Sequence, residues 1–153
     1  MEAENVKWQW DETKLDNTAI YCGSQLNYVF DEVVNTGRLQ LSDVSGNVNI
    51  IWEGKNVYAD TAFLLIDENV LFAAVYSQSS TGCKILALNL SSNQILWENQ
   101  LLGLGSVGHS RYRNKVQMIL TDNKLVVFGQ ELGGKYIEVR NPASGDLILN
   151  RKI

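Results

Sequence analysis

The sequence predicts an all-β fold, or a β-rich α+β fold with one helix near residues 24–36, in a single domain over residues 1–153. The length of 153 residues is that of about one domain and is enough to bury a core. The composition, 45% hydrophobic and 20% charged with one proline, excludes a disordered tail, a collagen-like repeat and a coiled coil. A recurring strand–turn–strand pattern predicts about three four-stranded antiparallel blade-like units, at about residues 4–53, 61–101 and 115–152.

The repeat is clearest in three hairpins. Residues 87–97 read as a strand, a polar turn and a second strand that ends in Trp97, and residues 139–149 align with them without a gap, 52 residues later. Residues 41–52 form a looser copy with one inserted residue. Residues 62–76 and 116–129 precede two of these hairpins, and each of them reads as a strand, an Asp-containing turn and a strand. A hairpin pair of this kind predicts a four-stranded unit.

The first unit leaves two interpretations open. Leu26, Val29, Phe30, Val33 and Val34 have the spacing of an amphipathic helix, with Ser24 as N-cap and Gly37 at the C-terminal end. A strand would instead place Leu26, Tyr28 and Phe30 on one face. Residues 6–10 alternate between apolar and polar side chains, which is typical of an additional outer strand that covers a sheet edge.

The hairpin pattern resembles the PQQ-like (quinoprotein-type) β-propeller repeat, whose hallmark is Ala-Leu-Asp-x-x-Thr-Gly-x-x-x-Trp. The best copy runs from Ala87 to Trp97, with Asn89 and Asn93 at the Asp and Gly positions, and the last copy keeps Gly145 but has Leu149 in place of Trp. The resemblance implies blades, and propellers close with four to eight of them. Three units are therefore expected to pair with a second chain as six blades, to pack as an open array, or to be part of a longer propeller.

Charge is distributed unevenly along the chain. Residues 1–68 hold 12 acidic and 4 basic residues, whereas residues 69–153 hold 5 acidic and 9 basic residues. Such a separation favours an oriented encounter with a charged partner or head-to-tail self-association. The acidic half supplies the candidate residues for contact with a basic partner protein, Asp11, Glu12, Asp16, Asp31 and Glu32.

The segment 102–114 is an insertion in the repeat, and inserted loops on repeat scaffolds often carry function. Gly103, Gly105 and Gly108 spell a dinucleotide-binding motif, but no helix follows, so we expect no nucleotide site. The loop also provides a candidate site for phosphate or a carboxylate-rich surface, formed by His109, Arg111, Tyr112, Arg113 and Lys115.

Catalytic and cofactor chemistry finds little support. His109 is the single histidine, and no serine and acid are brought to it as in a hydrolytic triad. We expect no metal site, because Cys22 and Cys83 lie far apart without a companion histidine, and both are read as buried thiols. We expect no cofactor: the adjacent-cysteine pair and long chain of quinone enzymes, which the resemblance would require, are absent. The four tryptophans, Trp8, Trp10, Trp52 and Trp97, are expected to pack between sheets.

The sequence therefore predicts a non-catalytic protein-binding module. Acidic residues stand where a signal peptide would carry basic ones, so we expect a cytoplasmic protein, and apolar runs of about five residues are too short for a membrane partner. One form of the hypothesis is an acidic inhibitor of the immunity-protein type that neutralises a toxin such as a nuclease. The alternatives are a structural propeller component that forms a homo-oligomer, and a small-ligand-binding protein or enzyme that uses the 102–115 loop. Nucleic acid is an unfavourable partner for a net charge of −4.

Overall fold

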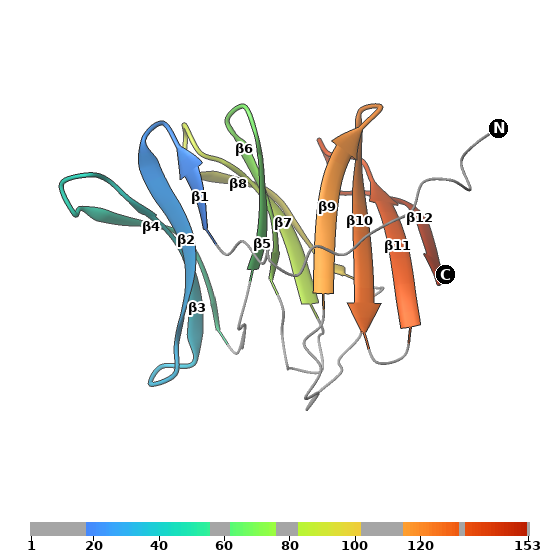
Figure 1. Ribbon diagram of the computed structural model, residues 1–153, viewed down its shortest axis with the longest axis horizontal. Helices are drawn as coiled ribbons and strands as arrows, with labels where there is room; N and C mark the ends of the chain where they lie inside the picture. Colours follow the sequence, from blue (N-terminus) through green and yellow to red (C-terminus); the bar gives the residue numbers. More distant parts are fainter. Residues whose placement is uncertain (1–17, 56–61, 76–82, 102–114, 132–133, 153) are drawn as a thin grey trace.

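The computed structural model describes residues 18–55, 62–75, 83–101, 115–131 and 134–152, and these residues form strands and turns without a helix (Figure 1). The first sheet contains β1 (Thr18–Tyr21), β2 (Ser24–Asp31), β3 (Thr36–Ser42) and β4 (Val48–Lys55). The second contains β5 (Ala62–Asp67), β6 (Val70–Val75), β7 (Cys83–Asn89) and β8 (Gln94–Leu101). The third contains β9 (Lys115–Thr121), β10 (Lys124–Glu131), β11 (Gly134–Arg140) and β12 (Leu147–Lys152). The predicted all-β fold of three four-stranded antiparallel units is confirmed.

Residues 24–36 form a strand and a turn, so the helical interpretation is wrong and the strand interpretation is confirmed. Leu26 and Tyr28 are buried, and Phe30 packs against the same core cluster, so alternate residues of β2 face the second sheet. Val33 is 94% exposed, whereas the helical interpretation required it to lie on the buried apolar face of a helix. The Asp31 carboxylate accepts a hydrogen bond from the Val33 amide at 2.9 Å and so starts the turn that ends the strand.

Each sheet contains the same irregularity between its third and fourth strands. The register shifts at Leu39/Gln40, Ala87/Leu88 and Val139/Arg140, so each fourth strand carries one extra residue. That residue directly precedes Trp52, Trp97 or Leu149, respectively. A bulge increases the local twist of a sheet, and its recurrence shows that the three hairpins found in the sequence are one structural repeat.

The turn between the third and fourth strands is built alike in the three repeats. The side chains of Asp43, Asn89 and Asn141 each accept hydrogen bonds from backbone amides two to four residues further on. A residue with positive φ follows in each turn, at Gly46, Asn93 and Gly145. Asn93 occupies the glycine position at only a small cost in backbone strain, because asparagine adopts the left-handed backbone conformation more readily than most residues.

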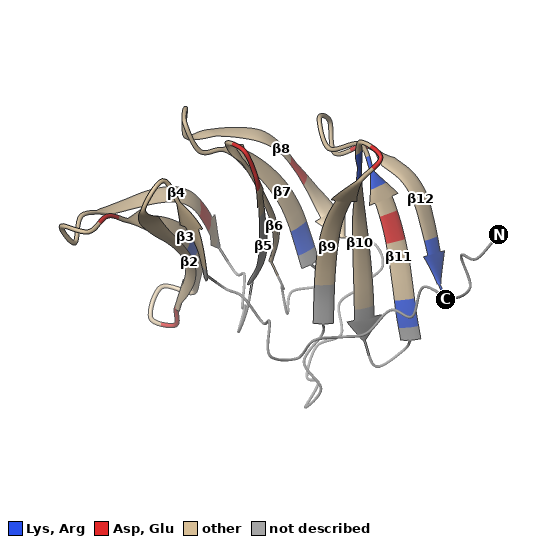
Figure 2. Ribbon diagram, turned by 45° about the horizontal axis from the view of Figure 1, so that its top comes forward, with Lys and Arg blue, Asp and Glu red and all other residues tan. Residues whose placement is uncertain are grey.

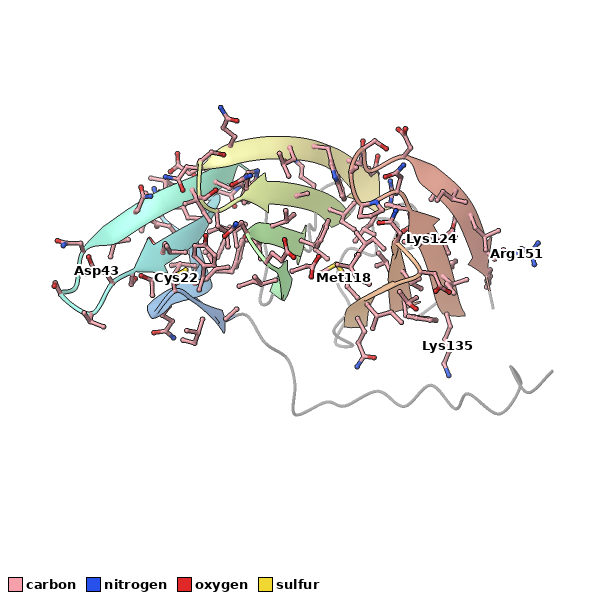
Figure 3. All side chains as sticks on the ribbon, turned by 90° about the horizontal axis from the view of Figure 1, so that it is seen from above. Cys22, Asp43, Met118, Lys124, Lys135 and Arg151 are labelled. Atoms are coloured by element: carbon pink, nitrogen blue, oxygen red, sulfur yellow. The ribbon has the colours of Figure 1, made fainter. Side chains whose placement is uncertain are left out.

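The sheets stand one behind the other and their first strands lie side by side, β1 beside β5 and β5 beside β9 (Figures 1 and 3). The second sheet is therefore buried on both faces. Leu71, Ala73, Val75, Leu86 and Leu88 belong to the core shared with the first sheet. The residues that alternate with them belong to the core shared with the third sheet, and they include Phe72, Ala74, Ile85 and Ala87.

The tryptophans and cysteines have mixed outcomes. Trp52 and Trp97 are buried, one in each core, as expected for packing between sheets. Cys22 is exposed, so the expectation of a buried thiol is wrong: it lies in the tight β1–β2 turn, with positive φ, and a two-residue turn points away from the core. Cys83 begins β7. Trp8, Trp10 and the outer strand expected at residues 6–10 lie outside the described residues.

Candidate functional site

The basic loop remains a prediction. His109, Arg111, Tyr112 and Arg113 lie outside the described residues, and Lys115 is the first residue of β9. Leu101 is the last residue of β8. The inserted segment thus connects the outer strand of the second sheet to the first strand of the third sheet.

Two of the five acidic candidates are described, and only Glu32 is classed as exposed, since Asp31 is half-buried. Asp11, Glu12 and Asp16 lie outside the described residues. Glu32 is exposed in the β2–β3 turn. Asp31 ends β2, and its Oδ2 lies 3.6 Å from Nη1 of Arg38. The Nε of Arg38 also donates to the Glu53 carboxylate at 2.8 Å, which is the main reason why the pKa of Arg38 is raised. The first sheet therefore neutralises part of its own acidic charge.

Arg38 lies on the face of the first sheet that points away from the second sheet. This surface, the polar end face, is formed by three cross-strand pairs of β2 and β3. The pairs are Gln25 with Ser42, Asn27 with Gln40, and Val29 with Arg38. Five of these six central side chains are polar. The two edge strands add exposed apolar side chains to the same face, those of Ile20, Val48 and Ile50.

The opposite end of the stack has a different character. The face of the third sheet that points away from the second sheet, the apolar end face, carries two rows of side chains across all four strands. One row is wholly apolar, and the other is apolar at its centre. They are Ile119, Val126, Val139 and Leu149, and then Gln117, Phe128, Ile137 and Arg151. Arg151 projects away from the other two sheets (Figure 3).

The apolar end face is not covered by another described sheet. Ile119 is 39% exposed, and Phe128, Ile137, Val139 and Leu149 are half-buried, whereas Val126 in the centre of the sheet is only 9% exposed. At the equivalent positions of the other two sheets, Trp52 and Trp97 are buried by the sheet that follows. A contiguous apolar patch on a protein surface commonly marks a site of protein–protein contact.

Polar groups are buried at the junction of the second and third sheets. Arg140 is 3% exposed and lies 2.6 Å from the Glu138 carboxylate. Its other donors reach the carbonyl oxygens of Gly145 at 3.0 Å and Gln100 at 2.8 Å. The Nε of Arg140 has no hydrogen-bond partner among the described residues. Sequence reasoning did not single out this pair, because charged residues that alternate along a strand are normally on its solvent side.

Two open depressions lie beside this junction. One, of about 430 Å³, is lined by Lys84, Glu98, Asn99 and Gln100, and Lys84 and Glu98 form an ion pair with each other at 3.6 Å. The other, of about 280 Å³, is lined in part by Arg140, whose donors already bind protein acceptors. Lys84, Glu98 and Arg140 are therefore engaged within the fold, whereas Asp146 is exposed at the rim of the second depression.

The described ranges hold no helix with the length and apolar character needed to cross a membrane. Nor do they contain a group of three or more His, Cys, Asp or Glu side chains placed to hold a metal ion.

Comparison by sequence found no relatives: no protein-family model matches the chain, and no curated protein matches it. Comparison by structure found proteins of similar fold. AztD from Citrobacter koseri matches 85% of this chain with a TM-score of 0.55 and 12% identity, and BamB from Moraxella catarrhalis matches 87% with a TM-score of 0.52 and 11% identity. TolB from Acinetobacter baumannii matches 82% with a TM-score of 0.50 and 13% identity.

These matches establish the fold alone. The chain spans only part of the solved proteins, 32% of AztD, 36% of BamB and 28% of TolB. All three are β-propeller-like proteins, and the stacked four-stranded sheets with adjacent first strands fit propeller blades. The chain therefore has a β-propeller-like fold of three blade-like sheets.

Proposed function

We propose that the protein is a non-catalytic protein-binding module that associates, through its apolar end face, with a blade-like sheet of another polypeptide. The single observation that carries this proposal is the row of Ile119, Val126, Val139 and Leu149 across the third sheet. Within the chain, apolar sheet faces are what hold the blades together. A fourth face of the same kind is suited to the same form of association.

Equivalent positions support this comparison. Leu39, Ala87 and Val139 lie in the third strands, directly before the register shift caused by the bulge in the fourth strands. The first two are buried against the following sheet. Burying apolar surface yields about 25 cal/mol for each Å², so a face of half-buried aliphatic side chains gains free energy when a partner covers it. A catalytic role has no comparable support among the described side chains.

The finer assignment to PQQ-like blades belongs to the same proposal. It is supported by the contact between Trp97 and the turn of the next repeat. The indole Nε1 donates to the Pro142 carbonyl at 2.8 Å, and the ring lies against Gly145. These are the Trp and Gly positions of the repeat motif, and here they bind consecutive blades to each other.

The test compares two baits that differ only in which end face is damaged. Tagged protein carrying Ile119→Lys is compared with Val29→Lys, because the two side chains are 39% and 38% exposed on opposite ends of the stack. We expect wild type and Val29→Lys to capture a stoichiometric partner from the source cell, and Ile119→Lys to lose it. That partner is then purified and titrated by calorimetry. Equal capture by both variants would overturn the proposal.

The acidic-inhibitor hypothesis has one specific observation in its favour, the 12 acidic and 4 basic residues in positions 1–68. Opposite charge accelerates encounter with a basic protein. Under this hypothesis, reversing Glu32 and Asp31 to lysine lowers the association rate with a basic nuclease and reduces its salt dependence. An unchanged rate would remove the hypothesis.

A further inference from the structure

We infer that the apolar end face binds the same face of a second copy of this chain, in a two-fold symmetric dimer in which each strand of the third sheet faces the same strand of the other copy, running in the opposite direction. The inference rests on the proposed function and names its partner. It differs from a head-to-tail arrangement, in which the apolar end face of one copy would cover the polar end face of the next.

The chemistry of the two end faces disfavours the head-to-tail arrangement. It would cover Gln40 and Arg38 at the centre of the polar end face with aliphatic side chains, and a buried polar group without a partner costs free energy. Arg38 would also be separated from water together with Glu53. Two apolar end faces present no such groups at the centre of the contact. Identical patches that face each other form an isologous interface, which closes at two copies.

Charge along the strands selects the direction of the two sheets. The turns at one end of the third sheet carry Asp122 and Asp146, beside Lys124. The opposite end carries four basic residues and one acidic residue, namely Lys115, Lys135, Arg151, Lys152 and Glu131, and is therefore basic in sum (Figure 2). A two-fold axis that lies between the two faces, parallel to the sheets and perpendicular to the strands, places the acidic end of each copy over the basic end of the other. An axis parallel to the strands would place like charges together, which is unfavourable.

The size of the face predicts how stable the dimer is. Four strands of about seven residues cover roughly 23 by 19 Å, so two copies bury on the order of 900 Å². Specific stable interfaces begin at about 1,200 Å², so this contact belongs to the weak, reversible class. We therefore expect the dimer to form at high protein concentration and to dissociate on dilution.

The first experiment measures self-association of the purified protein by sedimentation velocity between about 5 and about 500 μM. We expect wild type and Val29→Lys to shift from monomer to dimer with concentration, and Ile119→Lys to weaken the dimer by at least about tenfold. Val139→Lys is a second variant at the centre of the same face, and thermal unfolding verifies that each variant is folded. A wild-type monomer at every concentration would overturn the inference, as would equal effects of Val29→Lys and Ile119→Lys.

The second experiment tests the orientation with a zero-length carboxyl-to-amine cross-linker. Within one copy, Asp122 and Lys135 lie at opposite ends of a strand of about 20 Å, so a link between them must join two copies. We expect this link between isotope-labelled and unlabelled protein, with a link from Asp122 to Lys124 as the internal positive control. A dimer without links between acidic and basic ends would overturn the proposed orientation. A monomeric purified protein with a foreign partner lost on Ile119→Lys would refute the dimer and leave the proposed function standing.

Discussion

The two junctions between sheets use the same repeat but different chemistry. The first junction, between the first and second sheets, is closed by Leu86 and Leu88 of β7. At the equivalent positions on either side of the bulge, the second junction has Glu138 and Arg140 of β11. Trp97 adds a hydrogen bond to the Pro142 carbonyl at the second junction. The core of the first junction is thus apolar, with a hydrogen bond from the Tyr21 hydroxyl to the Asn69 side chain at its exposed edge. The second junction combines an apolar core with a buried polar cluster.

This difference indicates that one set of residues stabilises the contact between the second and third sheets and another set fixes its geometry. Contacts between aliphatic side chains have no preferred direction, whereas the Arg140 guanidinium fits its acceptors in one arrangement, with Glu138, Gly145 and Gln100. A buried ion pair contributes little net stability compared with apolar side chains of similar size, because both charges lose their hydration. We infer that the polar cluster fixes the position of the third sheet on the second, while the apolar residues provide the driving force.

The largest expected effect comes from breaking the buried pair on one side. Glu138→Leu places at position 138 the residue type that Leu86 provides at the first junction. The Arg140 charge then stays buried without its carboxylate partner. We expect the free energy of unfolding to fall by about 3–5 kcal/mol. Urea denaturation followed by tryptophan fluorescence measures the change.

The double variant E138L/R140L is the control for this prediction. It removes both charges and reproduces the Leu86 and Leu88 pattern of the first junction. We expect it to recover most of the loss, to within about 2 kcal/mol of wild type, because no charge remains buried alone. If the double variant were as unstable as E138L, the two junctions would differ in shape and not only in chemistry.

The turn glycines give the next largest effect. Gly145 has a φ of +76°, and a Cβ added there would lie 2.5 Å from the Trp97 ring. We expect Gly145→Ala to cost roughly 3 kcal/mol, from left-handed strain plus overpacking. Gly46 has a φ of +86° and open space around it, so a substitution there introduces backbone strain without overpacking. We therefore expect Gly46→Ala to cost about 1 kcal/mol. Equal losses in thermal unfolding would show that the Trp97 ring moves aside freely.

The two tryptophans provide a smaller contrast. Trp97→Phe removes the indole donor from the Pro142 carbonyl, whereas no hydrogen bond of the Trp52 indole is found among the described residues. Both variants lose packing, so we expect Trp97→Phe to be more destabilising than Trp52→Phe by about 1 kcal/mol. Denaturant midpoints of the two variants measure this difference. A larger loss at Trp52 would mean that packing dominates both junctions.

Much of this architecture could be predicted from the sequence. The polar turn with Asn89 or Asn141 and the strand that ends at Trp97 are local signals, and they located the repeat. The choice between helix and strand at Leu26 and Tyr28 could not be made locally. The spacing fitted both, and the second sheet, which these side chains cover, decided the outcome.

The candidate site was harder to predict. The apolar end face depends on which strand faces are already covered, and that requires the order in which the sheets stack. Val126, Val139 and Leu149 read like any core residues in the sequence, as do Leu71 and Leu88. The charge of Asp31 was visible in the sequence, but its neutralisation by Arg38 follows only from the register of β2 and β3.

The smallest expected effect is a dependence on pH that only the first repeat has. Asp43 occupies the turn position that Asn89 and Asn141 fill in the other repeats, and hydrogen bonds from Asn47 lower its pKa below the ordinary 3.8. A carboxyl whose pKa is lower in the folded protein stabilises the fold above its unfolded pKa, and this contribution is lost as pH falls through the folded value. We therefore expect Asp43→Asn to reduce stability near neutral pH and the difference from wild type to shrink as the medium becomes acidic. Urea midpoints of both proteins between about pH 6 and about pH 3 test this sign. A constant difference across that range would mean that the carboxylate acts through turn geometry alone, as the two asparagines do.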